Sequence, residues 1–102
     1  MEKYLFVFYG GKMPTDPKGR EQSMAAWMKW FQELGTAVVE MGAPTKPGKL
    51  VNAKGVKDAG SKGVDGYSVI QADNMDAAVA FAKKCPIMAE GGEISINTVM
   101  PM

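Results

Sequence analysis

The feature that most constrains this fold is the apolar run KYLFVFY, which spans residues 3–9 near the start of the chain. Aromatic and β-branched residues fill the run and a pair of glycines ends it, so we expect a buried strand. One face of this strand consists of Tyr4, Phe6 and Phe8, and the other of Leu5, Val7 and Tyr9. Because both faces are apolar, both need cover from the rest of the protein.

Two helices are predicted by apolar residues that recur every three or four positions. The first runs from about Arg20 to Leu34, and Gly35 closes it. Its apolar stripe consists of Met24, Trp27, Met28, Phe31 and Leu34. We therefore expect Trp27 and Phe31 to face a sheet, and Trp30, which lies off the centre of the stripe, to be partly exposed or at an interface.

The remaining pattern completes a single domain over residues 1–102. A second helix is expected from Met75 to Cys85, before Pro86. Further strands are expected at 37–41, 65–72 and 93–100. The order is βαββαβ, which predicts the α+β class and a ferredoxin-like domain with an antiparallel four-stranded sheet. Two helices cover one face of such a sheet, so a second copy of the chain is expected to cover the other, in a homodimer.

The stretch from Pro44 to Gly63 differs in composition from the rest of the chain, because prolines and glycines separate its few strand-forming residues. We expect a mobile loop or an irregular hairpin there. Its charged residues are Lys46, Lys49, Lys54, Lys57, Lys62 and Asp58. The stretch is thus strongly basic. It is interpreted as a solvated surface hairpin, with a basic lid over an acidic ligand as the alternative.

Composition argues against several kinds of partner. Lys and Arg number 12 and Asp and Glu number 11, so the net charge of +1 creates no field to attract nucleic acid or a membrane. Histidine is absent and Cys85 is the single cysteine, so we expect a structural thiol, no metal site and no cofactor. The first apolar run is too short for a signal peptide or a membrane span, and a cytoplasmic protein is expected.

A site for a small polar or aromatic ligand is predicted on the sheet face away from the helices. If the isoleucines of the last strand point toward the helices, Ser95 and Asn97 point away from them. The predicted ligand-binding residues are Tyr9, Lys12, Asp65, Tyr67, Ser95 and Asn97, which would line a cleft at the dimer seam. Aromatic rings with a few polar groups are typical of small-molecule pockets. Alternatively, Ser95 and Asn97 form hydrogen bonds across the interface.

Catalysis is left open by these residues, because none of them forms a pair of nucleophile and base. No residue is therefore assigned as catalytic. The alternative to a binding protein is a small enzyme that acts on a small organic substrate. In that enzyme Asp65 would transfer a proton, and Tyr67 or Tyr9 would act as a donor.

Four stretches carry a family resemblance: KYLFVFYGG at the start, ELG at the end of the first helix, GYSVIQADNMDAAVAFAKKCP from Gly66 to Pro86, and the closing GGEISINTVMPM. On these residues the chain resembles the YCII-related family, specifically its DGPF-domain branch, over nearly its whole length. The resemblance implies a ferredoxin-like fold that assembles as a dimeric α/β barrel.

The chain departs from that family where activity is concerned. Family members resemble one another in a histidine and an aspartate thought to be catalytic, and this chain has no histidine. Residues 57–67, KDAGSKGVDGY, lack the literal DGPF tetrapeptide, and Ile87 stands where the family frequently has a histidine after Cys-Pro. The resemblance therefore implies the fold, whereas the dyad cannot operate here.

Overall fold

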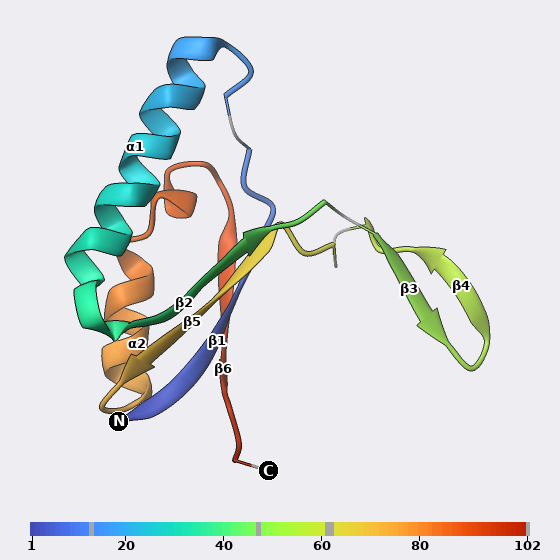
Figure 1. Ribbon diagram of the computed structural model, residues 1–102. Coiled ribbons are helices and arrows are strands. Elements are labelled where there is room, and N and C mark those ends of the chain that lie inside the picture. The colour runs from blue at the N-terminus through green and yellow to red at the C-terminus, as the bar shows by residue number, and fades with distance from the viewer. Residues whose placement is uncertain (13, 47, 61–62, 102) are drawn as a thin grey trace.

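The structure is a computed structural model that describes residues 1–12, 14–46, 48–60 and 63–101. In chain order its elements are β1 (Glu2–Tyr9), α1 (Pro17–Leu34), β2 (Val38–Pro44), β3 (Lys49–Asn52), β4 (Gly55–Asp58), β5 (Gly66–Ala72), α2 (Met75–Lys83) and β6 (Glu93–Thr98) (Figure 1). Short 3-10 turns cover Gly35–Ala37 and Pro86–Met88. Over these ranges no helix is both long and apolar enough to cross a membrane.

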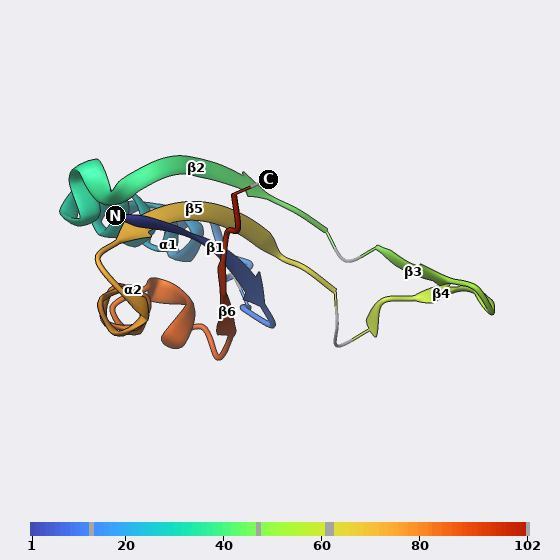
Figure 2. The same ribbon diagram turned by 90° about the horizontal axis from the view of Figure 1, so that it is seen from below.

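A four-stranded antiparallel sheet in the order β2-β5-β1-β6 forms the centre of the molecule. β1 is an inner strand, with β5 on one edge and β6 on the other. The first and last strands of the main sheet are therefore neighbours, although the whole chain separates them. Both helices lie on the same face of the sheet (Figures 1 and 2). This arrangement confirms the predicted ferredoxin-like α+β fold.

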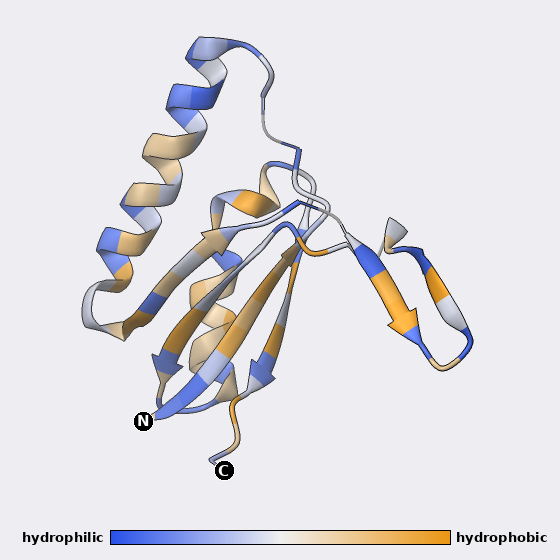
Figure 3. Ribbon diagram, turned by 45° about the vertical axis from the view of Figure 1, so that its right-hand side comes forward, coloured by the Kyte–Doolittle hydropathy of each residue, from blue (hydrophilic) through white to orange (hydrophobic). Residues whose placement is uncertain are grey.

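The side chains of β1 alternate between the two faces of the sheet. Tyr4, Phe6 and Phe8 are buried on the helix face, with 1%, 0% and 5% of their surface exposed. On the other face Leu5, Val7 and Tyr9 are half-buried, and their β5 neighbours Val69 and Tyr67 pair with Leu5 and Val7. An apolar strip therefore crosses the open face of the sheet. Figure 3 shows hydrophobic residues along the strands of this sheet.

Trp30 lies in the core, which corrects the prediction that it would be partly exposed. Only 3% of its surface is exposed, and its ring lies 6.4 Å from the ring of Phe6 and 6.3 Å from that of Phe8, measured between centroids. Its indole N–H donates a 3.0 Å hydrogen bond to the carbonyl oxygen of Phe81 in α2. Trp30 thus connects both helices to the central strand.

The physical reason is the rotation of α1 about its axis. Its buried residues are Ser23 and Trp30, two turns apart, whereas Met24 and Met28 are 61% and 47% exposed. Apolar side chains cover a wide arc of this helix, so their spacing alone leaves several rotations open. Turning the large indole toward the sheet buries more apolar surface than turning a methionine, and this favours the observed rotation. Trp27 is left half-buried at the side.

The basic stretch after β2 forms a regular two-stranded hairpin. β3 pairs with β4 from Lys49 opposite Asp58 to Asn52 opposite Gly55, and the Lys49 ammonium forms an ion pair with Asp58. The hairpin reaches away from the main sheet (Figures 1 and 2). Its paired valines, Val51 and Val56, are mostly exposed. Pro47, Ser61 and Lys62 of this stretch lie outside the described residues.

Replacing Trp30 by alanine is expected to lower the free energy of unfolding by about 3–5 kcal/mol, because it opens a cavity in the core. Met24→Ala, on the exposed side of the same helix, is the control and is expected to change that free energy by about 0.5 kcal/mol. Urea denaturation followed by circular dichroism measures both. Equal losses for the two variants would contradict the position assigned to Trp30.

Candidate functional site

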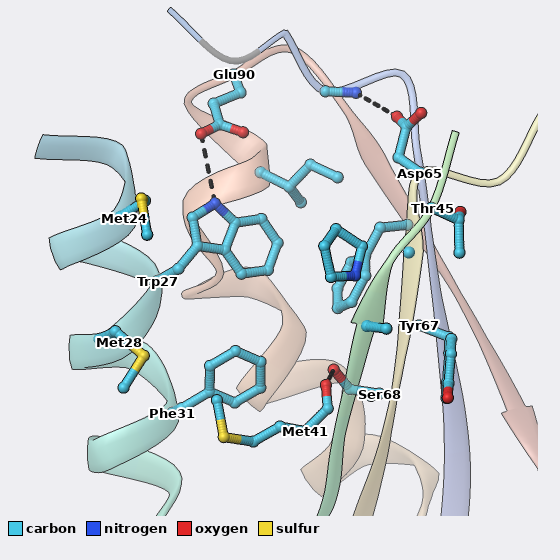
Figure 4. A pocket seen from close by; sticks show the side chains of 17 residues that line it. Met24, Trp27, Met28, Phe31, Met41, Thr45, Asp65, Tyr67, Ser68 and Glu90 are labelled. Carbon is cyan, nitrogen blue, oxygen red and sulfur yellow. Dashed lines mark hydrogen bonds between the residues drawn. The ribbon is translucent and has the colours of Figure 1, made fainter. Parts of the chain in front are cut away.

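A pocket of about 630 Å³ lies between α1 and the sheet edge formed by β2 and β5. α1 and β2 meet at the turn over Gly35–Ala37 and diverge from there (Figure 1). The lining side chains are shown in Figure 4. They come from α1 (Met24, Trp27, Met28 and Phe31), from residues 41–45 and 65–68, and from Phe8, Gly11, Ile87 and Glu90. Most of this lining is apolar.

Aromatic rings form the inner wall of the pocket. Trp27 meets Phe8 edge to face, with 5.1 Å between ring centroids, and meets Trp30 at 5.9 Å. Phe31 lies 6.3 Å from Trp27 and 5.0 Å from Trp30. Such edge-to-face and tilted contacts are the favourable arrangements for aromatic pairs. Because Trp30 is buried in the core, the wall is held in place before any ligand binds.

The opposite side of the pocket depends on an irregular part of β2. The register between β2 and β5 shifts before Ala43, and Gly42 has a positive φ of 74°. A Cβ atom on Gly42 would lie 1.8 Å from the carbonyl oxygen of Tyr67, so only glycine allows this close approach. The hydroxyl of Ser68 donates a 2.7 Å hydrogen bond to the carbonyl oxygen of Met41, whose side chain lies near Phe31 (Figure 4).

Two carboxylates lie at one end of the pocket, beside the backbone of Gly11 (Figure 4). Asp65 Oδ2 accepts a 3.1 Å hydrogen bond from the Gly11 N–H. Glu90 Oε1 accepts hydrogen bonds from the Ser23 hydroxyl at 2.6 Å and from the Trp27 indole N–H at 3.4 Å. A Cβ atom on Gly11 would lie 3.4 Å from Glu90 Oε2. Hydrogen bonds thus hold the two carboxylates in place on either side of Gly11.

Four of the six predicted binding residues lie on the open face of the sheet. Tyr9, Tyr67, Ser95 and Asn97 share that face through the pairing of β1 with β5 and β6. The Asn97 amide donates a 3.1 Å hydrogen bond to Ser95 Oγ, and the Tyr67 hydroxyl donates one of 3.4 Å to Glu40. Ligand binding by these four side chains stays a prediction.

Asp65 and Lys12 lie apart from those four residues. Asp65 borders the pocket beside α1, whereas Lys12 borders a shallower hollow that it shares with Glu90. The reason is that the chain turns out of the sheet at Gly10, where φ is 69°. Within one chain the structure therefore does not bring the six residues together around one cleft. Tyr67 borders the pocket as well, while its hydroxyl reaches Glu40.

Sequence reasoning missed the pocket residues of α1 and the carboxylate of Glu90. Trp27 and Phe31 are expected to face the sheet; they pack against the core, and the sides left half-buried form the pocket wall. Helical spacing is the same for a core stripe and for a pocket wall, so it could not separate the two. The concentration of methionines beside these rings, Met24 and Met28, was the available sign of a less tightly packed surface.

Cys85 is buried, as expected for a structural thiol, with 3% of its surface exposed. Burial raises the pKa of its thiol to about 12, and the nearby Glu90 carboxylate adds to the rise, while a hydrogen bond from the Ile87 backbone opposes it. A thiol with such a pKa stays protonated at neutral pH and is a poor nucleophile. Over the described ranges there is also no group of three His, Cys, Asp or Glu side chains that could hold a metal ion.

The sheet order, the two helices on one face and the pocket beside α1 define a small ferredoxin-like α+β protein with a preformed hollow. The chain belongs to the YCII-related family, whose domain model matches residues 4–102. This match confirms the family resemblance, while the DGPF branch stays a prediction.

Among solved structures, the chain is similar to 5-chloro-2-hydroxyhydroquinone dehydrochlorinase (TftG) from Burkholderia phenoliruptrix AC1100, in complex with 2,5-dihydroxybenzoquinone. The two are 18% identical with a TM-score of 0.52, and the similarity covers 96% of this chain and 93% of that one. At this identity the likeness supports the fold alone. Among curated proteins, none matches the sequence.

In the folded protein at pH 8, Cys85 is expected to react with iodoacetamide at least about 100-fold more slowly than in urea, because little of the buried thiol is ionised and access is blocked. The folded-state rate should continue to rise with pH toward about 12, since the folded pKa lies there. Mass spectrometry of the alkylated fraction gives both rates. A folded-state rate that levels off near pH 9 would contradict the raised pKa.

Proposed function

We propose that this protein binds a small, mainly apolar or aromatic molecule in the pocket between α1 and the edge of β2 and β5. The observation that carries the proposal is the pocket itself, with about 630 Å³ of space and a wall of Trp27, Phe31 and Phe8. Pockets of ~300–1,000 Å³ with apolar walls and a few polar groups are typical of small-molecule sites. Asp65 and Glu90 supply such polar groups at one end.

The ligand of the structural neighbour supports the proposed size. TftG was solved with 2,5-dihydroxybenzoquinone, a compound of one six-membered ring, and shares the fold of this chain. The identity of 18% is too low to transfer its reaction or the chemistry of its ligand, so only the ligand's size enters the proposal.

Binding is favoured over catalysis by the groups that face the pocket. The alternative function, proton transfer by Asp65 with a tyrosine as partner, retains one element, because Asp65 borders the pocket. Of the two candidate partners, Tyr67 borders the pocket but its hydroxyl donates to Glu40, and Tyr9 is not among the lining residues. Cys85 does not line the pocket. We therefore propose a ligand-binding protein first and an Asp65-dependent enzyme second.

A neutral aromatic alcohol, 2-naphthylmethanol, is expected to bind saturably and to change the tryptophan fluorescence, because Trp27 forms part of the wall. Phe31→Leu removes an aromatic face and should weaken binding by about fivefold to tenfold, equivalent to roughly 1 kcal/mol. Phe81→Leu is the matched control, since Phe81 packs against the core without lining the pocket.

Fluorescence titration or calorimetry gives the dissociation constants for the native protein and both variants. Saturable binding that Phe31→Leu weakens and Phe81→Leu leaves unchanged supports the site. Equal weakening by the two variants would show that the ligand binds elsewhere or that binding depends only on core stability.

We further propose that two copies of the chain pack through the open sheet faces as a dimeric α/β barrel in the cytoplasm. The support is the apolar strip of Leu5, Val7, Val69 and the two tyrosines, which the helices leave uncovered. Covering apolar surface is worth about 25 cal/mol per Å², so self-association is the economical way to remove this strip from water. In such a dimer the Tyr9, Tyr67, Ser95 and Asn97 set would lie at the seam.

Light scattering at micromolar concentration is expected to give about 22 kDa, twice the chain mass of 11.0 kDa. Val7→Lys places a charge in the centre of the strip and should shift the mass to that of a monomer. Val51→Lys, on the exposed hairpin, is the control and should leave the dimer intact. A native protein that runs as a monomer would rule out the barrel assembly.

A further inference from the structure

We infer that the ligand of this pocket is an organic cation, an amine or ammonium group carried on an apolar or aromatic body. The inference rests on the proposed binding function and specifies the chemical class of the ligand. It follows from two properties of the described lining: the sign of its charges and the aromatic rings that border the cavity.

The charged side chains among the described lining residues are both acidic. They are Asp65 and Glu90, and no described lining residue is a lysine or an arginine. The single arginine of the chain, Arg20, donates to the Pro14 carbonyl oxygen near the start of α1. Lys12 borders the neighbouring hollow. Among the residues that the structure describes, a ligand in the pocket therefore meets two carboxylates and no cationic side chain.

The two carboxylates also lack ion-pair partners in the part of the chain that the structure describes. The ion pair found there joins Lys49 to Asp58 on the hairpin. Asp65 and Glu90 are held by neutral donors instead: the Gly11 N–H, the Ser23 hydroxyl and the Trp27 indole. Neutral donors orient a carboxylate without cancelling its charge. The negative end of the pocket thus remains available to a positive group.

The aromatic wall adds to this preference. Trp27 connects the two parts of the site, because its indole N–H bonds to Glu90 while its ring borders the cavity beside Phe31 (Figure 4). Aromatic faces attract cations through the negative potential above the ring, and tryptophan does so most strongly. A carboxylate ligand would instead lose its hydration next to two like charges. A preference for a cation argues against the alternative in which the hairpin is a lid over an acidic ligand in this pocket.

Three probes of equal size test the inference at pH 7: 2-naphthylmethylamine, 2-naphthylmethanol and 2-naphthoate. The ammonium compound is expected to bind at least about tenfold more tightly than the carboxylate, with the alcohol between them. Added salt should narrow the difference, since salt screens exposed charges. Calorimetric titration of the full chain gives all three dissociation constants.

The double variant Asp65→Asn with Glu90→Gln removes both charges and keeps oxygen acceptors for the present hydrogen bonds. It should reduce the preference for the ammonium compound over the carboxylate to about threefold or less and change binding of the alcohol by less than about twofold. The control variant Asp73→Asn with Glu93→Gln alters the net charge equally at two exposed positions outside the pocket. It should keep the native preference.

The outcomes distinguish a failure of the cation inference from a failure of the proposed binding function. A preference that the pocket variant loses and the control variant keeps supports the inference. If 2-naphthoate binds the native protein as tightly as the ammonium compound, the inference is wrong and the binding function still holds. The same conclusion follows if the pocket variant still prefers the ammonium compound over the carboxylate. If none of the three probes binds at millimolar concentration, the proposed function and the inference fail together.

Discussion

The structure depends on the contact between the central strand and one tryptophan. β1 is paired on both edges, and its helix-facing rings, Phe6 and Phe8, need an apolar partner from above the sheet. Trp30 supplies that partner and also bonds to the Phe81 carbonyl of α2. One side chain thus sets the rotation of α1 and its distance from α2. Most features of the helix layer follow from this contact.

The pocket is a consequence of that rotation. With Trp30 turned into the core, Trp27 and Phe31 lie toward the β2 side of α1, where the edge strand diverges from the helix. Gly42 lets β2 approach β5 so closely that the strand bends instead of following the helix. Close packing would normally fill such a space. Here a rigid aromatic wall on one side and a bulged strand on the other keep it open.

The absence of histidine removes the commonest general base, but it does not leave the pocket without ionisable groups. The charged groups of the described pocket lining are two carboxylates held by neutral donors. In the proposed function these groups would recognise a ligand by its charge. Because the neighbouring thiol of Cys85 is protonated and buried, it adds no nucleophile to the pocket. The chain has the fold of the YCII-related family.

The sequence by itself determined the order of the two helices and the four strands of the main sheet, because strand and helix periodicities differ and turn residues mark the ends of each run. The alternation in β1 and β6 likewise predicted which residues share a face, including Ser95 with Asn97. Only the tertiary structure decided the rotation of α1, since the apolar side chains of this helix cover a wide arc and their spacing allows several rotations. It also decided that Asp65 joins Glu90 beside Gly11, because these residues are distant in sequence and meet only when β5 and β6 both pair with β1. Local patterns specify secondary structure and faces, whereas a pocket arises from packing between elements.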